Sequence, residues 1–115
     1  MSTNWKRLYG PTTATGTGAV AVLTSPANTA YVLTKLTVSN VTATAALATL
    51  SITPSGGAGL VQVWQKTIPG YPTTGSTMEV AELEGQILGA GDILTFTAGT
   101  ANALSLMVSG VAYTP

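Results

Sequence analysis

The sequence predicts an all-β protein, a single-domain, jelly-roll-like β-sandwich of seven to eight short antiparallel strands. Apolar and hydroxyl-bearing side chains alternate with a period of two along several runs, which is the pattern of strands with one face in a core. Clusters of Gly, Pro, Asn and Ser separate these runs, at the turn spacing typical of sandwiches and barrels. No segment has a sustained helical period. An immunoglobulin-like sandwich fits the same pattern, and the residues alone do not separate the two.

The chain of 115 residues is long enough for one domain with one core. We expect residues 1–18 to be an N-terminal arm or loop, and residues 19–115 to form the sandwich. The first part contains Trp5, Leu8 and Tyr9, followed by a Gly/Thr-rich stretch with little to bury. Its aromatic residues either cover the edge of the domain's own core or dock on a neighbouring subunit.

Four strands are expected in the first part of the sandwich, at residues 19–24, 30–40, 45–53 and 60–68. In the second of these, Val32, Thr34, Leu36 and Val38 would share one face, and the strand would end at Asn40. The run 45–53 is rich in Ala, a weak strand former. Its Thr, Ser and Ile residues favour a strand over a helix.

The last third of the chain predicts the closing strands. Residues 76–83 fit a strand, and residues 84–88 a single helical turn that leads into the corner Gly89–Asp92. The alternating run around Leu94 and Phe96, the turn at residues 99–102 and the run 103–113 are expected to form a hairpin.

Charged residues make up only 7% of the chain, against roughly 25% in typical soluble domains. Four basic and four acidic residues cancel, so the basic stripe of a nucleic-acid binder is missing. No apolar run reaches the length of a membrane span, and the N-terminus lacks the apolar region of a signal peptide. A surface with so little charge favours a protein that is covered by copies of itself or by a larger assembly. The alternative is a small soluble domain that tolerates the low charge.

The residues predict no catalytic site, no cofactor and no metal site. The chain has no His and no Cys, which removes the usual ligands of structural zinc and the commonest general base. Its carboxylates are Glu79, Glu82, Glu84 and Asp92. Glu82 and Glu84 would share a side if their stretch were extended, but a solvated strand edge is the expected role. Asp92 is expected to accept hydrogen bonds from nearby backbone N–H groups. We therefore expect that the protein is not an enzyme.

Aromatic side chains offer another possibility. Those at positions 5, 9, 31, 64, 71 and 113 are expected to be exposed and would suit a carbohydrate-binding module. Gln62 and Gln65 flank Trp64 and would help to hold sugar hydroxyls. The alternative is that Trp64 packs at a sheet edge or at a subunit contact.

Three segments resemble small β-sandwich structural proteins of tailed bacteriophage virions: Tyr31–Asn40, Glu84–Leu94 and Ala103–Tyr113. The similarity lies in a strand that ends in Asn, a Gly-Asp corner and a final strand with Ser-Gly-Val. It extends over roughly residues 20–113.

The resemblance implies a capsid decoration or cement protein on the exterior of the phage head. Its partners would be copies of itself, in a homotrimer, and the major capsid protein or other virion proteins. Similar domains occur in head fibres and tail parts, so a tail or head-fibre role is the alternative. No catalytic residues carry over. The residues expected to supply apolar contacts between subunits are Trp5, Leu8, Tyr9, Trp64, Tyr71 and Tyr113.

Overall fold

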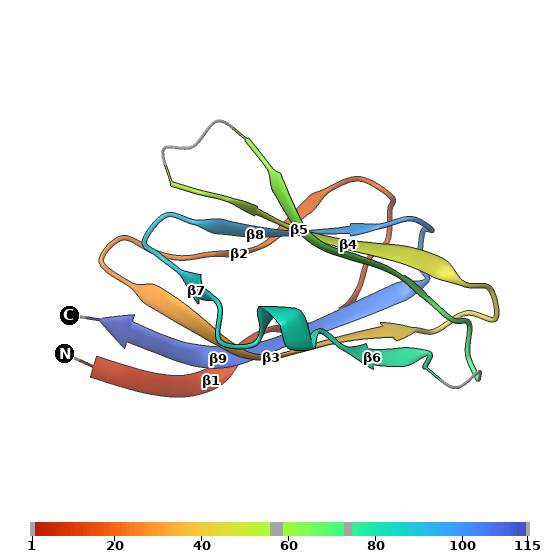
Figure 1. The fold of residues 1–115 in the computed structure, drawn as a ribbon, viewed down its shortest axis with the longest axis horizontal. Coiled ribbons are helices and arrows are strands. Elements are labelled where there is room, and N and C mark those ends of the chain that lie inside the picture. The colour runs from red at the N-terminus through yellow and green to blue at the C-terminus, as the bar shows by residue number, and fades with distance from the viewer. Residues whose placement is uncertain (1, 56–58, 73–74, 115) are drawn as a thin grey trace.

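The protein is a sandwich of two antiparallel sheets (Figure 1) in the computed structural model, which describes residues 2–55, 59–72 and 75–114. Sheet A contains, in spatial order, β1 (Ser2–Thr13), β9 (Leu104–Thr114), β3 (Ala30–Asn40) and β6 (Thr77–Glu79), and β7 (Ile87–Leu88) also pairs with β3. Sheet B contains β2 (Val20–Thr24), β8 (Ile93–Ala98), β4 (Ala46–Thr53) and β5 (Val61–Ile68). A short 3-10 helix, η1 (Ala81–Leu83), connects β6 to β7.

The strand pairs are nested along the chain. The first strand pairs with the last (β1 with β9), the second with the last but one (β2 with β8), β3 with β6 and β7, and β4 with β5. This nesting, wound over two four-position sheets, is the jelly-roll arrangement. The predicted fold class is therefore confirmed. The described residues contain nine strands because β6 and β7 share one position in the sheet.

The predicted hairpin at the end of the chain is wrong, although both of its strands and its turn exist. The turn around residues 99–102 carries the chain from sheet B to sheet A, so β8 pairs with β2 and β4, and β9 pairs with β1 and β3. Alternation along one strand shows which residues face the core, but it does not show which strand is the neighbour. Asn102 has a positive φ of 59° in this turn, a conformation that Asn tolerates.

The segment 1–18 is not the expected arm or loop over most of its length. It contributes β1, which pairs with β9 from Ser2 opposite Thr114 to Thr13 opposite Ser105. Leu8 and Tyr9 pack against the core from this strand, so part of the segment's apolar surface stabilises its own domain. Of its described residues, 2–18, only those after Thr13 form a loop.

The core lies between the sheets and follows the predicted alternation where strands are regular. Leu104, Leu106 and Val108 of β9 are fully buried, and β4 is a strand with its small Ala residues inward, as expected. In β3 the predicted shared face holds for Leu36 and Val38, which are buried, but not for Val32 and Thr34. A bulge between Leu33 and Lys35 adds one residue to the strand, so that both Leu33 and Leu36 point into the core.

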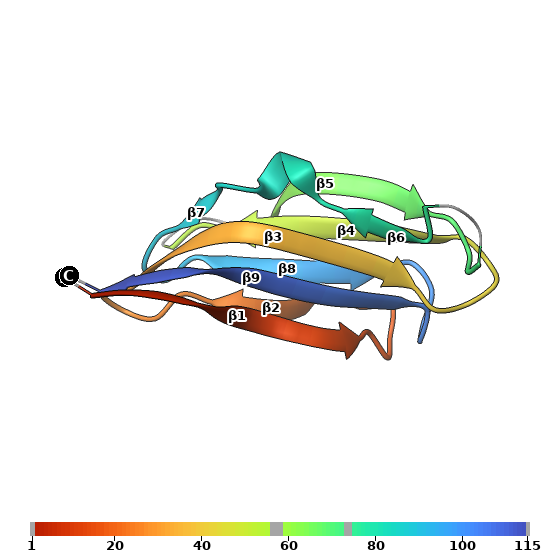
Figure 2. The same cartoon turned by 90° about the horizontal axis from the view of Figure 1, so that it is seen from below.

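The stretch from residue 76 to residue 88 also differs from prediction. The expected strand stops at Glu79, and the single helical turn lies at Ala81–Leu83 instead of at residues 84–88. Val80 and Leu83 at this turn are buried. The turn therefore closes the side of the sandwich between β3 and β5 (Figure 2).

Candidate functional site

The six residues predicted to contact partners divide into two groups. Trp5, Tyr71 and Tyr113 are exposed on the surface, at 73%, 64% and 38% of their area. Leu8 and Tyr9 are partly buried against the core, and Trp64 is buried within it. The structure thus leaves three of the six as surface residues, and they do not form a single cluster.

A row of apolar side chains crosses the outer face of sheet A, and we call it the apolar row. It consists of Trp5, Val111, Val32 and Ile87, which are direct cross-strand neighbours on β1, β9, β3 and β7. The adjacent row on the same strands contains Ala112, Tyr31 and Leu88, all buried in the core. Because successive residues of a strand point to opposite faces, the apolar row points away from sheet B. Figure 2 shows these strands side by side across the near face of the molecule.

Exposure along the apolar row is uneven. Trp5 and Ile87, at its two ends, are 73% and 58% exposed, whereas Val111 is only 3% exposed. Val111 is not a member of the core cluster between the sheets. Its cover therefore comes from the outer face, where its direct neighbours are Trp5 and Val32. The outer face thus carries a small apolar cluster of its own.

Charged side chains lie beside the apolar row on the same face. Arg7 and Lys35 lie in the next outward-facing row, opposite Ser109 of β9. The ammonium of Lys35 lies 3.1 Å from a carboxylate oxygen of Glu79. The hydrogen bond from Lys35 lowers the pKa of Glu79 below its ordinary 4.5. Loss of water contact raises the pKa of Glu84, and the neighbouring Glu79 carboxyl raises it further. The face is therefore acidic towards β6 and basic at β1.

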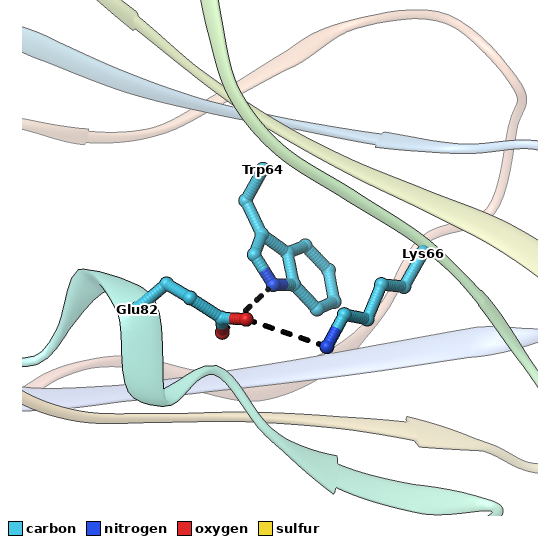
Figure 3. Close-up of polar contacts among 3 residues, drawn as sticks. All are labelled: Trp64, Lys66 and Glu82. Carbon is cyan, nitrogen blue, oxygen red and sulfur yellow. Dashed lines mark hydrogen bonds and ion pairs between the residues drawn. The ribbon is translucent and has the colours of Figure 1, made fainter.

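Glu82 points to the opposite side of η1 from that acidic pair, because the 3-10 turn replaces the extended chain that was expected. Its carboxylate accepts a hydrogen bond from the indole N–H of Trp64 at 3.2 Å and lies 3.3 Å from the ammonium of Lys66 (Figure 3). A hydrogen bond from its own backbone N–H is the main cause that lowers the pKa of Glu82, and Lys66 and Trp64 lower it further. This contact joins η1 to β5.

The prediction that Trp64 and Tyr31 are exposed is wrong. Trp64 is 6% exposed and Tyr31 is 8% exposed, and both belong to the core. Trp64 lies on β5, the edge strand of sheet B, where its indole packs beneath η1, so the alternative that Trp64 packs at a sheet edge is confirmed. It therefore cannot act as a sugar-stacking platform, and Gln62 and Gln65 do not frame one.

A shallow pocket of about 330 Å³ lies at the end of β3, and it is lined by Ser39, Asn40, Val41, Tyr71 and Thr77. The amide of Asn40 is fully engaged, because it donates to the carbonyl oxygens of Thr44 and Ile68 and accepts from Thr42. The hydroxyls of Ser39 and Thr77 lie 3.1 Å apart and bond to each other. Tyr71 forms the exposed wall of the pocket.

The remaining acid, Asp92, has the structural role that was predicted. Its two carboxylate oxygens accept hydrogen bonds from the backbone N–H groups of Gly89 at 2.9 Å and Ser55 at 2.8 Å. The second bond ties the corner to the end of β4 and was not expected. Within residues 2–55, 59–72 and 75–114, no group of three or more acidic side chains is placed to hold a metal ion. In the same residues, no helix has the length and apolar character needed to cross a membrane.

The apolar row and the charged side chains beside it are suited to contact with another protein surface. The fold and this surface define a class: a small jelly-roll β-sandwich with an apolar row on one outer face. The chain matches no model of a known protein family, and a search of curated proteins finds no match.

Three members of the apolar row were not among the predicted contact residues. Ile87 was expected in a helical turn, and Val32 was expected to share a face with Leu36 and Val38, from which the bulge in β3 separates it. In β9 the alternation of Leu104, Leu106 and Val108 continues through Gly110 and Ala112, and Val111 between them is buried as well, on the opposite face. The sequence did contain a signal for this: Val111 and Ala112 are consecutive apolar residues in the predicted strand, which indicates that both faces of the strand are covered there.

Proposed function

We propose that the chain is a structural protein of a tailed-phage virion, a capsid decoration (cement) protein that binds the head exterior and stabilises it by bridging subunits. The observation that carries this proposal is the apolar row, with Trp5 exposed at 73% on the outside of a regular sheet. Large aromatic residues exposed on an apolar surface are typical of binding surfaces. Jelly rolls are common among capsid domains, and the three segments that resemble virion proteins add support.

The mechanism is stabilisation by mass action. A protein that binds the mature shell, and not the free or rearranged capsid subunits, adds its binding free energy to the stability of the shell. Such a protein needs a preformed surface and no catalytic group. The low charge of the chain fits this role, because a surface that is covered in the assembly does not need to keep single molecules apart in solution.

The experiment is to locate the chain in purified particles. Virions of a phage whose genome encodes this chain are separated into heads and tails, and each fraction is analysed by quantitative mass spectrometry. The proposal expects the chain in the head fraction, in a fixed ratio to the major capsid protein. Recovery in the tail or fibre fraction would assign it to that alternative role, and absence from all fractions would contradict a virion function.

A second candidate function is glycan binding, which the pocket beside Tyr71 favours. Its volume of about 330 Å³ lies at the lower end of ordinary ligand pockets, and an exposed aromatic wall suits a sugar ring. It ranks second because the amide of Asn40 is already engaged with backbone groups. Titration with oligosaccharides tests it: binding that Tyr71→Ala abolishes and Trp5→Ser leaves unchanged would favour this function.

A further inference from the structure

The outer face of sheet A has a pattern that matches itself after rotation by half a turn. An axis parallel to the strands, midway between β9 and β3, exchanges the two halves of the face. It carries the position of Trp5 to that of Ile87, and the position of Val111 to that of Val32, because these residues form one row across the sheet. The next outward-facing row, two residues further along β9, places Tyr113 opposite Ala30. The rotation therefore exchanges a large side chain with a small one.

We propose that a second copy of this chain packs face to face on sheet A about such a two-fold axis. Each Trp5 then contacts the Ile87 of the other copy, and each Tyr113 lies over the other copy's Ala30. Contacts of this kind are isologous, since the same patch serves on both subunits. The inference takes the apolar row, which the proposed function uses as a binding surface, as a contact between copies of this chain, and it does not depend on the virion role.

Charge complementarity favours a second copy over an unrelated partner. Arg7 lies at the β1 edge of the face, one outward row from Trp5, and it forms no ion pair within the described residues. At the other edge Glu79 and Glu84 lie together, with Lys35 as their basic neighbour. The two-fold rotation brings the Arg7 edge of one copy over the acidic edge of the other, at both ends of the contact.

The face is also large enough. Three positions hold strands of 11 or 12 residues and the fourth holds the short β6 and β7, which gives roughly 600 Å² for each copy at about 3.3 Å per residue and about 4.8 Å between strands. Stable interfaces of standard size cover roughly 600–1,000 Å² on each partner, so the face reaches the lower end of that range. The two-fold contact gives a dimer and thus differs from the trimer that the resemblance implies.

The test uses cysteine variants, because the chain has no Cys of its own. Trp5→Cys protein is mixed with Ile87→Cys protein and treated with a short bismaleimide. In the proposed dimer the two thiols face each other across sheets about 10 Å apart, so the mixture yields a covalent dimer. Either variant alone places its two thiols at opposite edges of the dimer and cross-links much less. The mixture keeps one native Trp5–Ile87 contact.

Light scattering supplies the second measurement. The proposal expects the native chain to form a dimer, and Trp5→Ser to weaken it by on the order of ten-fold or more, as for the loss of a large aromatic contact. Val61→Ser is the matched control, since Val61 is 55% exposed but lies on β5 of sheet B, and it should leave the dimer intact. Arg7→Glu should weaken the dimer, and adding Glu84→Arg to the same chain should restore it.

The outcomes separate the two claims. A monomer at every concentration overturns both the self-association and this inference. The two-fold contact alone is overturned by an oligomer whose association Trp5→Ser does not weaken, by an oligomer that gives no cross-link in the mixture, or by an oligomer of three copies. A monomer whose Trp5→Ser variant loses particle binding assigns the face to a capsid partner and overturns the inference. Circular dichroism of each variant verifies that the sandwich is folded.

Discussion

The side-chain amide of Asn40 donates a hydrogen bond to the carbonyl oxygen of Ile68 at 3.1 Å, and thereby joins the end of β3 in sheet A to the end of β5 in sheet B. The same amide donates to the carbonyl of Thr44 at 2.8 Å and accepts two bonds from Thr42. Asn40 is 2% exposed. One buried side chain therefore fixes both the loop after β3 and the distance between the sheets at this end.

Replacing Asn40 with Ala should lower the free energy of unfolding by about 2–4 kcal/mol, because two carbonyl oxygens lose a donor in a site with little water. Asn40→Asp should lower the free energy of unfolding further at neutral pH, since a carboxylate oxygen would then face those carbonyl oxygens. This additional loss should shrink as the pH falls and the new carboxyl is protonated. Denaturant unfolding, followed by the fluorescence of buried Trp64, measures both.

Ser39→Ala is the control for the Asn40 variants. Ser39 is the preceding residue, but its hydroxyl bonds to Thr77 at an exposed position, so its loss should change the stability by less than about 0.5 kcal/mol. An Asn40→Asp protein as stable as the native chain would contradict the role given to this amide.

Gly110→Ala should destabilise the protein by about 2–3 kcal/mol or more. A Cβ at Gly110 would overlap the carbonyl oxygen of Val32 and would lie 2.8 Å from Cδ1 of Leu8. The carbonyl of Val32 belongs to the backbone of the neighbouring strand, so relief of this overlap requires a shift between β9 and β3. Gly16→Ala is the matched control, because a Cβ there meets nothing within 4 Å, and it should change the stability by less than about 1 kcal/mol. Thermal unfolding of the two variants gives the comparison.

Glu82→Gln should destabilise the protein at neutral pH and have little effect in acid. The folded-state pKa of Glu82 lies below its ordinary 4.5, so its carboxylate contributes stability above that value. The contribution is lost as the pH falls through the lowered folded-state pKa. The difference in unfolding free energy between the native chain and Glu82→Gln should therefore vanish below the pKa. Unfolding measured across this acidic range checks the sign.

Glu84→Gln should behave in the opposite way. The folded-state pKa of Glu84 is raised, so folding favours its protonated form. Any stability from that preference is present in acid and lost as the pH rises through the folded-state pKa. At neutral pH, Glu84→Gln should remove the repulsion with Glu79 and leave the protein at least as stable as the native chain. If the unfolding free energies of Glu82→Gln and Glu84→Gln had the same pH dependence, the different environments that η1 gives to Glu82 and Glu84 would be contradicted.

The sequence predicted most of the strands, because alternation is a local property that each strand carries by itself. It predicted a strand at residues 103–113, in which Leu104, Leu106 and Val108 are buried, and it predicted that Asp92 accepts hydrogen bonds from backbone N–H groups. It failed on properties that depend on more than one strand. The partner of β8 is set by a turn that crosses between sheets, and the face of Leu33 is set by a bulge whose extra residue leaves no local signal.

The candidate site was predicted only in part for the same reason. Trp5 was identified because a large aromatic residue in a polar stretch is conspicuous in any sequence. Its neighbours in the apolar row come from three other strands, and only the register of sheet A brings them together. Trp64 was wrongly expected on the surface, because its cover, η1, comes from residues that were assigned to a strand.

The most direct test of the proposed function is an add-back experiment on shells assembled without this chain. Purified protein is added to such particles, unbound protein is removed by sedimentation, and the temperature of DNA release is measured. The account predicts that the native chain sediments with the shells at a saturating ratio and raises the release temperature, and that Trp5→Ser does so less. Shells that neither bind the native protein nor become more heat-resistant in its presence would contradict a role in capsid decoration.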